Sequence, residues 1–410
     1  MKKFLKKARI LVFIVVFCCC IFDNRRLNTY AYNETNYEEA GLNFLTEQYE
    51  IKNFAYNNLY VYDSVDLFDV NDNKIAECLI VDRDGQLDYV VLDFSLDKID
   101  EFGYNQNELM QKFISADKIY YDGAMDYAVK VNGEFRDLDG NYINQNNFAG
   151  VTNTTANESF NNSNNPYGAF YSWKNISETN AGYENSAYNY LRGFNFSGIS
   201  DDGLSFKSQT NYNNQYNTTH SNRVDGTCGA VAVTDIFVYF QWRKIANKNG
   251  TVNALLNGSD YDTFERMIEL TKWTSDGVTL GNAKSALKSF AEEQNYNFDM
   301  DTYFWGTNWN KFISSINQGR PVLTEIQSTN SDGDFWGHLI MTVGYEQFTH
   351  TYSVNQRYWF FGWHDKWVTQ SDDYHYLRVV DGWSTSNSSR FIDYNGFWDE
   401  CNGTDFIIYS

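Results

Sequence analysis

The sequence predicts an α+β fold, because helix-like segments come before strand-like segments in its longer, C-terminal part. Apolar segments of helical length dominate from residue 230 to residue 318, and short runs of β-branched and aromatic residues dominate from residue 322 onward. Helices and antiparallel strands that are segregated along one chain are typical of α+β domains. A smaller α+β region is predicted at residues 32–150, where runs of alternating residues are separated by Asp-Gly and Asn-Gly turns.

Length and composition set the first limits on function. The chain has 410 residues, of which 42% are hydrophobic and 18% aromatic, so it is long enough for two or three domains with a sizeable core. Its formal net charge is −21. A surface this acidic repels nucleic acid and anionic lipid, so we expect neither as a partner.

Residues 1–31 have the features of an export signal. The basic stretch Lys2 to Arg9 precedes an apolar run of about 13 residues, and Thr29-Tyr30-Ala31 offers a cleavage site. That run is short for a bilayer span. We therefore expect a secreted or cell-surface protein with no stable membrane insertion after signal removal, and a retained anchor is the alternative.

Cysteine usage indicates isolated thiols and no disulfide framework. Three of the six cysteines lie in the predicted leader, which leaves Cys78, Cys228 and Cys401 in the exported chain. Three cysteines in a chain of this length do not form a framework. We expect Cys78 and Cys401 to be single buried thiols, although a bond between them is an alternative.

The chain divides into a signal peptide (1–31), a small α+β domain (32–150), a linker rich in Asn and Thr (151–165) and a larger domain (166–410). In the small domain we expect a helix at 40–54, strands at 59–62, 75–81 and 89–94, and a hairpin of 127–131 with 142–143. In the larger domain we expect an irregular stretch to residue 223, helices at 230–249, 261–273, 282–295 and 308–318, and strands at 322–326, 338–345, 357–363, 376–380 and 406–409.

The segment Asp225-Gly226-Thr227-Cys228-Gly229 delivers a cysteine to the start of an apolar helix. Asp225 or Thr227 can cap the first turn of this helix. Unpaired N–H groups and the helix dipole at that position favour the thiolate. A buried structural cysteine is the simpler alternative, but the flanking glycines leave the backbone bare, as the approach of a substrate requires.

Two further residues complete a candidate catalytic set. His338 follows Gly337 at the head of an apolar strand, where an imidazole can act as the base that a thiol nucleophile needs. Asp381 ends another apolar strand and can orient that imidazole. A surface histidine and an Asp-Gly turn are the ordinary alternatives for these two residues.

The order of these motifs resembles the papain-like cysteine peptidases. Gly226-Thr227-Cys228-Gly229 is similar to their nucleophile motif, Gly337-His338 to their base motif, and Asp381-Gly382-Trp383 to their Asn-Ser-Trp element, with Asp in place of Asn. Gln318-Gly319-Arg320-Pro321-Val322 is like the segment that precedes the histidine in secreted bacterial members, which include streptopain-like and bacteriocin-processing peptidases. The resemblance covers roughly residues 215–385.

The resemblance implies a role for each motif. Cys228 would attack the peptide carbonyl, His338 would shuttle the proton, and Asp381 would orient His338. Asn222 stands where the superfamily has an oxyanion-hole Gln, and Gln215 is the alternative donor; the second donor would be the Cys228 N–H. Trp383 would shield the His338–Asp381 pair from water.

The same resemblance implies a precursor. Residues 32–150 would then be a propeptide that acts as an intramolecular inhibitor, and protein or peptide would be the substrate. An independent adhesion or binding domain is the competing interpretation of this region.

Other functions remain open from the residues alone. A cell-wall amidase or a transglutaminase-like acyltransferase would use the same triad, and the many aromatic residues also fit a non-catalytic surface binding protein on a peptidase scaffold. The sequence contains no paired Cys-x-x-Cys or His-x-x-x-His, and we expect no metal or other cofactor.

Overall fold

The computed structural model describes residues 34–93, 98–123, 125, 127–138, 140, 142–143, 171–195, 203–275, 277–303, 309–329, 335–359, 363–383, 390–394 and 400–409. The predicted export signal and the predicted linker lie outside this part of the chain. Within it, no helix is both long enough and apolar enough to cross a membrane.

The described chain contains helices at both ends of a large sheet. The helices are α2 (Glu34–Ile51), α3 (Asn107–Ser115), α5 (Gln209–Thr219), α6 (Cys228–Trp242), α7 (Asp260–Leu270), α8 (Leu280–Glu293) and α9 (Trp309–Asn317), with a 3-10 turn at Leu256–Gly258. The strands are β1 (Leu59–Phe68), β2 (Lys74–Arg83), β3 (Gln86–Asp93), β4 (Lys98–Gly103), β5 (Ile119–Tyr121), β6 (Tyr127–Val131), β7 (Glu134–Asp137), β8 (Tyr171–Tyr190), β9 (Asn297–Tyr303), β10 (Val322–Thr329), β11 (Phe335–Trp359), β12 (Trp363–Val380), β13 (Arg390–Asp393) and β14 (Glu400–Tyr409).

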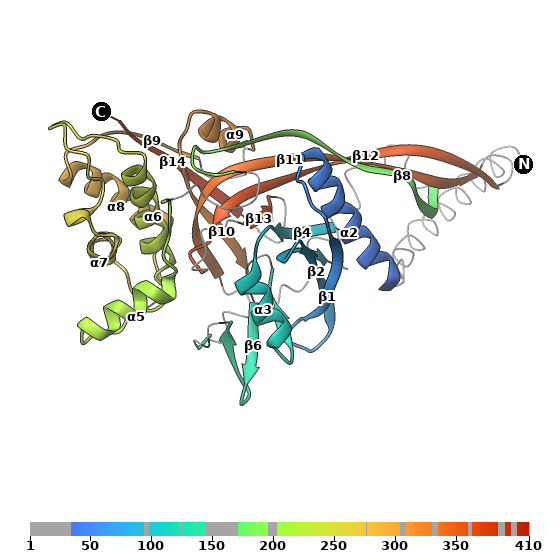
Figure 1. The fold of residues 1–410 in the computed structure, drawn as a ribbon, viewed down its shortest axis with the longest axis horizontal. Coiled ribbons are helices and arrows are strands. Elements are labelled where there is room, and N and C mark those ends of the chain that lie inside the picture. The colour runs from blue at the N-terminus through green and yellow to red at the C-terminus, as the bar shows by residue number, and fades with distance from the viewer. Residues whose placement is uncertain are drawn as a thin grey trace, which may run out of the picture.

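All the described strands join one sheet. Its order is β7-β6-β5-β1-β2-β3-β4-β13-β12-β11-β10-β14-β9, and β8 pairs with β11 off this path. The β1–β5 pair is parallel and the other pairs are antiparallel. Figure 1 shows α5 to α8 gathered at one end of the molecule, while β8, β11 and β12 run side by side past α2 at the other.

The N-terminal part, from α2 to β7, covers both faces of its strands with a helix. Met110 and Phe113 of α3 pack into a core with Leu67, Ile80 and Val91 of the first three strands. On α2, Phe44, Leu45 and Tyr49 pack into a second core with Val90 and Phe102. This second core also contains residues of the C-terminal part.

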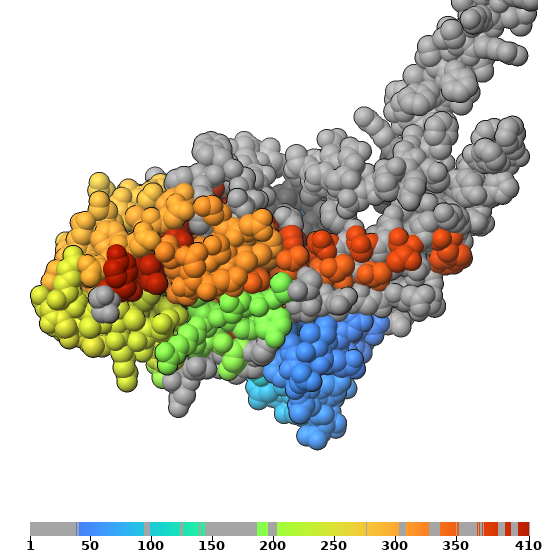
Figure 2. All heavy atoms as spheres, turned by 90° about the horizontal axis from the view of Figure 1, so that it is seen from above, coloured from blue at the N-terminus to red at the C-terminus, as the bar shows by residue number. Residues whose placement is uncertain are grey.

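The two parts of the chain meet at the pairing of β4 with β13. Phe102 of β4 lies opposite Phe391 of β13, and their rings stack with centroids 4.7 Å apart. Tyr376 of β12 donates a hydrogen bond to the carbonyl of Ile99 at 3.0 Å. Met125, in the turn before β6, is 1% exposed and packs into the core of the C-terminal part. In Figure 2 the blue surface of the N-terminal part borders the green surface that begins near β8.

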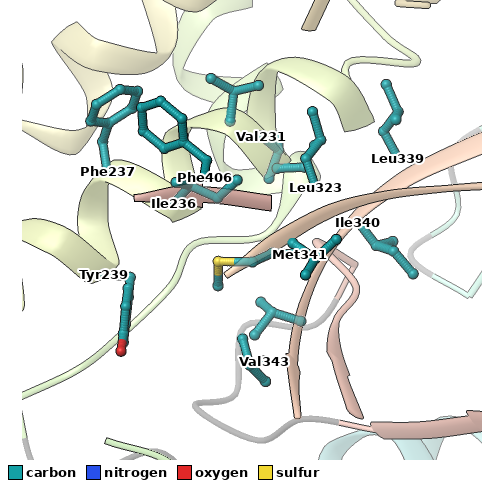
Figure 3. Close-up of a cluster of buried hydrophobic side chains, with 14 of the residues drawn as sticks. Val231, Ile236, Phe237, Tyr239, Leu323, Leu339, Ile340, Met341, Val343 and Phe406 are labelled. Carbon is teal, nitrogen blue, oxygen red and sulfur yellow. The ribbon is translucent and has the colours of Figure 1, made fainter. Parts of the chain in front are cut away.

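Helix α6 is the centre of the C-terminal part. Its apolar side chains are buried nearly all round, as the sequence predicts, because α7 and α8 cover one side and the sheet covers the other. Figure 3 shows Val231, Ile236 and Phe237 of α6 facing strand residues that include Leu339 and Phe406. This packing fixes the N-terminus of α6 against the start of β11.

Four sequence predictions about elements are wrong. The strand at 127–131 pairs with residues 134–137 of β7 instead of 142–143, and Tyr142 forms an isolated bridge with Arg136. The stretch before residue 223 contains β8 and α5, and α5 begins because the Ser208 side chain accepts from the Asn211 N–H and so caps an otherwise polar helix. The strands predicted at 338–345 and 357–363 are not separate as predicted, because residues 338–345 and 357–359 belong to the single long strand β11 and Trp363 begins β12. Helix α6 ends at Trp242 instead of Asn249, because Lys244 adopts φ +54°.

Candidate active site

Cys228 is the first residue of α6, and its sulfur is held where the helix meets the sheet. Gly226 precedes it with φ +56°, a conformation that favours glycine. Gly229 follows it, and a Cβ at that position would lie 2.7 Å from Val278 and 2.8 Å from Leu339. The glycines that the sequence places beside the cysteine therefore allow a turn on one side and close packing on the other.

The capping of this helix differs from the prediction. Thr227 is the N-cap residue, but its side chain makes no capping hydrogen bond. Its hydroxyl donates to Asn213 Oδ1 of α5 at 2.6 Å, and Asp225 is exposed. Thr227 therefore ties α5 to α6, and the first N–H groups of α6 remain available near the sulfur.

The thiol of Cys228 is more neutral than the sequence predicts. Burial raises its pKa, and the main-chain N–H groups of Leu339, Gly229 and Cys228 offset this only in part. The nearby Glu325 of β10 raises the pKa further. Desolvation exceeds the effect of the helix N-terminus here, so the thiol form is favoured.

His338 lies at the start of β11, next to the residue whose N–H reaches the sulfur. Its partner in the sheet is Ile326 of β10. Its Nε2 lies 3.1 Å from the main-chain oxygen of Asp381, and its ring stacks on Trp383 with centroids 4.2 Å apart. The side chain is 4% exposed, and burial lowers the pKa of its imidazole to about 4.

Asp381 meets His338 through its main chain, in contrast to the expected role of its carboxylate. Oδ2 accepts from Arg390 Nε at 2.6 Å and from Arg390 Nη2, and Oδ1 accepts from the Trp383 N–H at 2.9 Å. The carboxylate is thus held by a guanidinium while the carbonyl oxygen faces Nε2. Sequence reasoning missed Arg390, which follows a stretch without any motif.

Both candidate oxyanion donors are exposed side chains on or just after α5. Asn222 is exposed in the turn between α5 and α6, and Gln215 is exposed on α5. Among the described residues, no hydrogen bond joins either side chain to Cys228. The main-chain N–H of Cys228 lies close enough to its own sulfur to lower the pKa of the thiol.

A second acid that the sequence did not single out lies behind the site. Asp235 of α6 is 1% exposed, and among the described residues neither of its carboxylate oxygens has a hydrogen-bond partner. Burial, together with the charges of Asp381 and Asp260, raises the pKa of Asp235 well above its ordinary value. The sequence could have indicated Asp235, because it is a charged residue within an otherwise apolar helix.

The region that contains Cys228 and His338 is similar to known cysteine peptidases. Residues 206–374 match the family described as Peptidase_C39 like family. No curated protein matches the chain. Among solved structures, the active wild-type interpain A cysteine protease of Prevotella intermedia is similar at 14% identity and a TM-score of 0.32, over 54% of this chain and 95% of that chain.

The family match includes Cys228 and His338 and ends before Asp381. A TM-score of 0.32 is too low to place individual residues, so the family match carries the comparison. That match confirms the resemblance of this region to the papain-like cysteine peptidase superfamily.

Proposed function

We propose that this chain is a secreted cysteine endopeptidase that is made as a precursor. Cys228 is the nucleophile, His338 the general base and acid, and Asp381 the residue that orients His338. The reaction passes through an acyl-thioester. Residues 32–150 act as an intramolecular inhibitor, and export follows from the leader at residues 1–31.

One observation carries the proposal: the sulfur of Cys228 is contacted by the N–H of Leu339, the residue after His338. The main chain next to His338 therefore lies at the start of the helix that carries Cys228, which supports a thiol and an imidazole acting together. Nucleophilic catalysis by cysteine requires this neighbourhood.

The steps follow from a resting pair of neutral thiol and neutral imidazole. As sulfur attacks the carbonyl carbon of the substrate, the thiol proton passes to His338. The carbonyl oxygen becomes an oxyanion that the N–H of Cys228 stabilises. The intermediate collapses as His338 gives the proton to the leaving amine, which breaks the C–N bond and leaves the acyl-thioester. Water, deprotonated by His338, then releases the acid and restores the thiol.

The proposed inhibitory role of the N-terminal part rests on how firmly it is docked. It extends the sheet of the C-terminal part at β13, shares an aromatic core with it and contributes Met125 to the core around α6. An interface of this kind keeps the N-terminal part in place beside the peptidase region until it is displaced.

We expect Cys228→Ala to lower the casein cleavage that follows self-cleavage of the parent chain by about a thousandfold or more, because the thioester forms on this sulfur. Self-cleavage of the chain should stop as well. The measurement is fragment release from casein, and of shorter forms of the chain itself, followed by gel electrophoresis and mass spectrometry.

Cys401→Ala is the matched control, since Cys401 is a buried thiol on β14 and should leave cleavage intact. Casein cleavage that survives in the Cys228 variant would contradict the proposed nucleophile. Release of peptides from peptidoglycan, with casein untouched, would instead identify an amidase.

A further inference from the structure

Arg390 occupies the junction between the two parts of the chain. It is the first residue of β13, a short strand that pairs with β12 on one edge and with β4 on the other. Its side chain is buried, with 5% exposure. A buried guanidinium in a strand of four residues needs charged partners, and it has one in each part of the chain.

The partner on the peptidase side is Asp381. Nε and Nη2 of Arg390 both donate to Oδ2, while the main chain of the same aspartate provides the oxygen that faces His338. Because Oδ1 accepts from the Trp383 N–H, both carboxylate oxygens are engaged. The guanidinium therefore decides which oxygen of Asp381 lies next to the imidazole.

The partner on the N-terminal side is Glu101 of β4. Its Oε1 lies 3.6 Å from Arg390 Nη1, and its side chain is fully buried. Tyr89 and Tyr127 each donate a hydroxyl to Oε1 at 2.6 Å, and the Met125 N–H donates to Oε2. Glu101 is thus an acidic side chain held in place within the N-terminal part, next to the arginine.

We propose that Arg390 is a positioning residue of the active site: it holds the Asp381 carboxylate off His338, and Glu101 couples this arrangement to the docked N-terminal part. The proposal rests on the proposed function, in which His338 is the base. In this arrangement Glu101 of the N-terminal part affects the pKa of His338 by way of Arg390 and Asp381.

The charges around His338 fix the direction of the effect. Asp381 favours the imidazolium, whereas Arg390 opposes it. Among the neighbouring elements, Glu325 of β10 interacts electrostatically with Cys228 of α6, and the buried Asp235 of α6 interacts with Asp381. Replacing Arg390 with a neutral residue releases the Asp381 carboxylate, which can then accept a hydrogen bond from His338. It also removes a positive charge that repels the imidazolium. Both changes raise the pKa of His338.

The test is a titration of the His338 ring in the full chain by NMR, with histidines labelled in the ring and the His338 signal assigned from its loss in His338→Gln. We expect Arg390→Gln to move the midpoint of this titration upward by about one pH unit or more. Arg390→Lys, which keeps the charge without the forked geometry, should restore most of the original midpoint. An unchanged midpoint in a folded Arg390→Gln protein would overturn the positioning role.

Glu101→Gln tests the link to the N-terminal part and leaves the Arg390–Asp381 pair in place. Without the glutamate charge, the guanidinium acts on His338 uncompensated, so the midpoint should move downward, opposite to the Arg390→Gln result and by a smaller amount. Glu77→Gln on β2 is the matched control, since Glu77 is a buried acid of the same sheet that bonds Lys74 and Ser64. A Glu101 variant that behaves like this control would overturn the coupling.

The titration needs no substrate, so its outcome is independent of the casein assay. If the His338 midpoint shifts as expected but the chain cleaves no casein through Cys228, the positioning role of Arg390 stands and the peptidase function is rejected. An unshifted midpoint in an enzyme that cleaves casein through Cys228 would do the reverse.

Discussion

Replacing Lys52 with methionine should destabilise the folded chain by about 3–5 kcal/mol, because it leaves the buried carboxylate of Glu346 without the ammonium that contacts both of its oxygens. Lys52 follows α2, and Glu346 lies on β11, so this pair spans the junction of the two parts. Nζ lies 2.7 Å and 2.8 Å from the two carboxylate oxygens, and both side chains are fully buried.

The surroundings of this pair explain why the single change is so costly. Nζ also donates to the Tyr104 hydroxyl at 3.1 Å and lies 4.9 Å from the centroid of that ring. Burial lowers the pKa of Lys52, which shows that the site is poorly solvated. Water cannot replace the missing ammonium without opening the aromatic core shared by α2, β4 and β13.

The measurement is the free energy of unfolding in urea for Lys52→Met, Glu346→Gln and the double variant. We expect each single variant to lose several kcal/mol and the double variant to recover to within about 1 kcal/mol of the parent chain, since the pair is then neutral. Additive losses in the double variant would show that packing, and not the ion pair, dominates at this site.

Asp235→Asn should stabilise the chain increasingly as pH rises through neutral to alkaline values, because it removes a buried carboxyl group that has no hydrogen-bond partner among the described residues and resists ionisation. The pKa of Asp235 is raised in the folded chain, so the folded chain holds a proton that the unfolded chain releases near the ordinary value of 3.8. Stability contributed by this group is therefore lost as pH rises above that value.

The check is the pH dependence of the unfolding free energy for the parent and the Asn variant. Their difference should be smallest well below pH 3.8, where the Asp235 carboxyl is neutral in both the folded and the unfolded chain, and should grow as pH rises. The same substitution at the half-buried Asp262 of α7 controls for the amide itself. A difference that is constant with pH would mean that folding does not change the pKa of Asp235, which would contradict the account.

The helices α7, α8 and α9 could be predicted from sequence because their apolar residues recur at helical spacing, and this spacing marks the face that is buried. The expected helices at 261–273, 282–295 and 308–318 correspond to α7, α8 and α9 within a few residues. The polar helix α5 has no such period, and its existence depends on the Ser208 cap and on contacts with α6 and α7.

The parts of the site that depend on distant pairing could not be predicted. The positions of Cys228 and His338 follow from local motifs, a glycine-flanked helix start and a glycine before a strand. The engagement of Asp381 with Arg390 follows from the pairing of β13 with both β12 and β4, which no local pattern encodes. Burial that raises the pKa of the Cys228 thiol is likewise a property of the assembled core.

Trapping the acyl-enzyme tests the central claim most directly. The full chain is mixed with a chromogenic peptide ester, quenched in acid within one turnover and analysed by intact and tandem mass spectrometry. The account predicts one acyl group, held as a thioester on Cys228, and no adduct on the buried Cys78 or Cys401. Turnover of the ester with no acyl group on Cys228, or with the group on another residue, would contradict it.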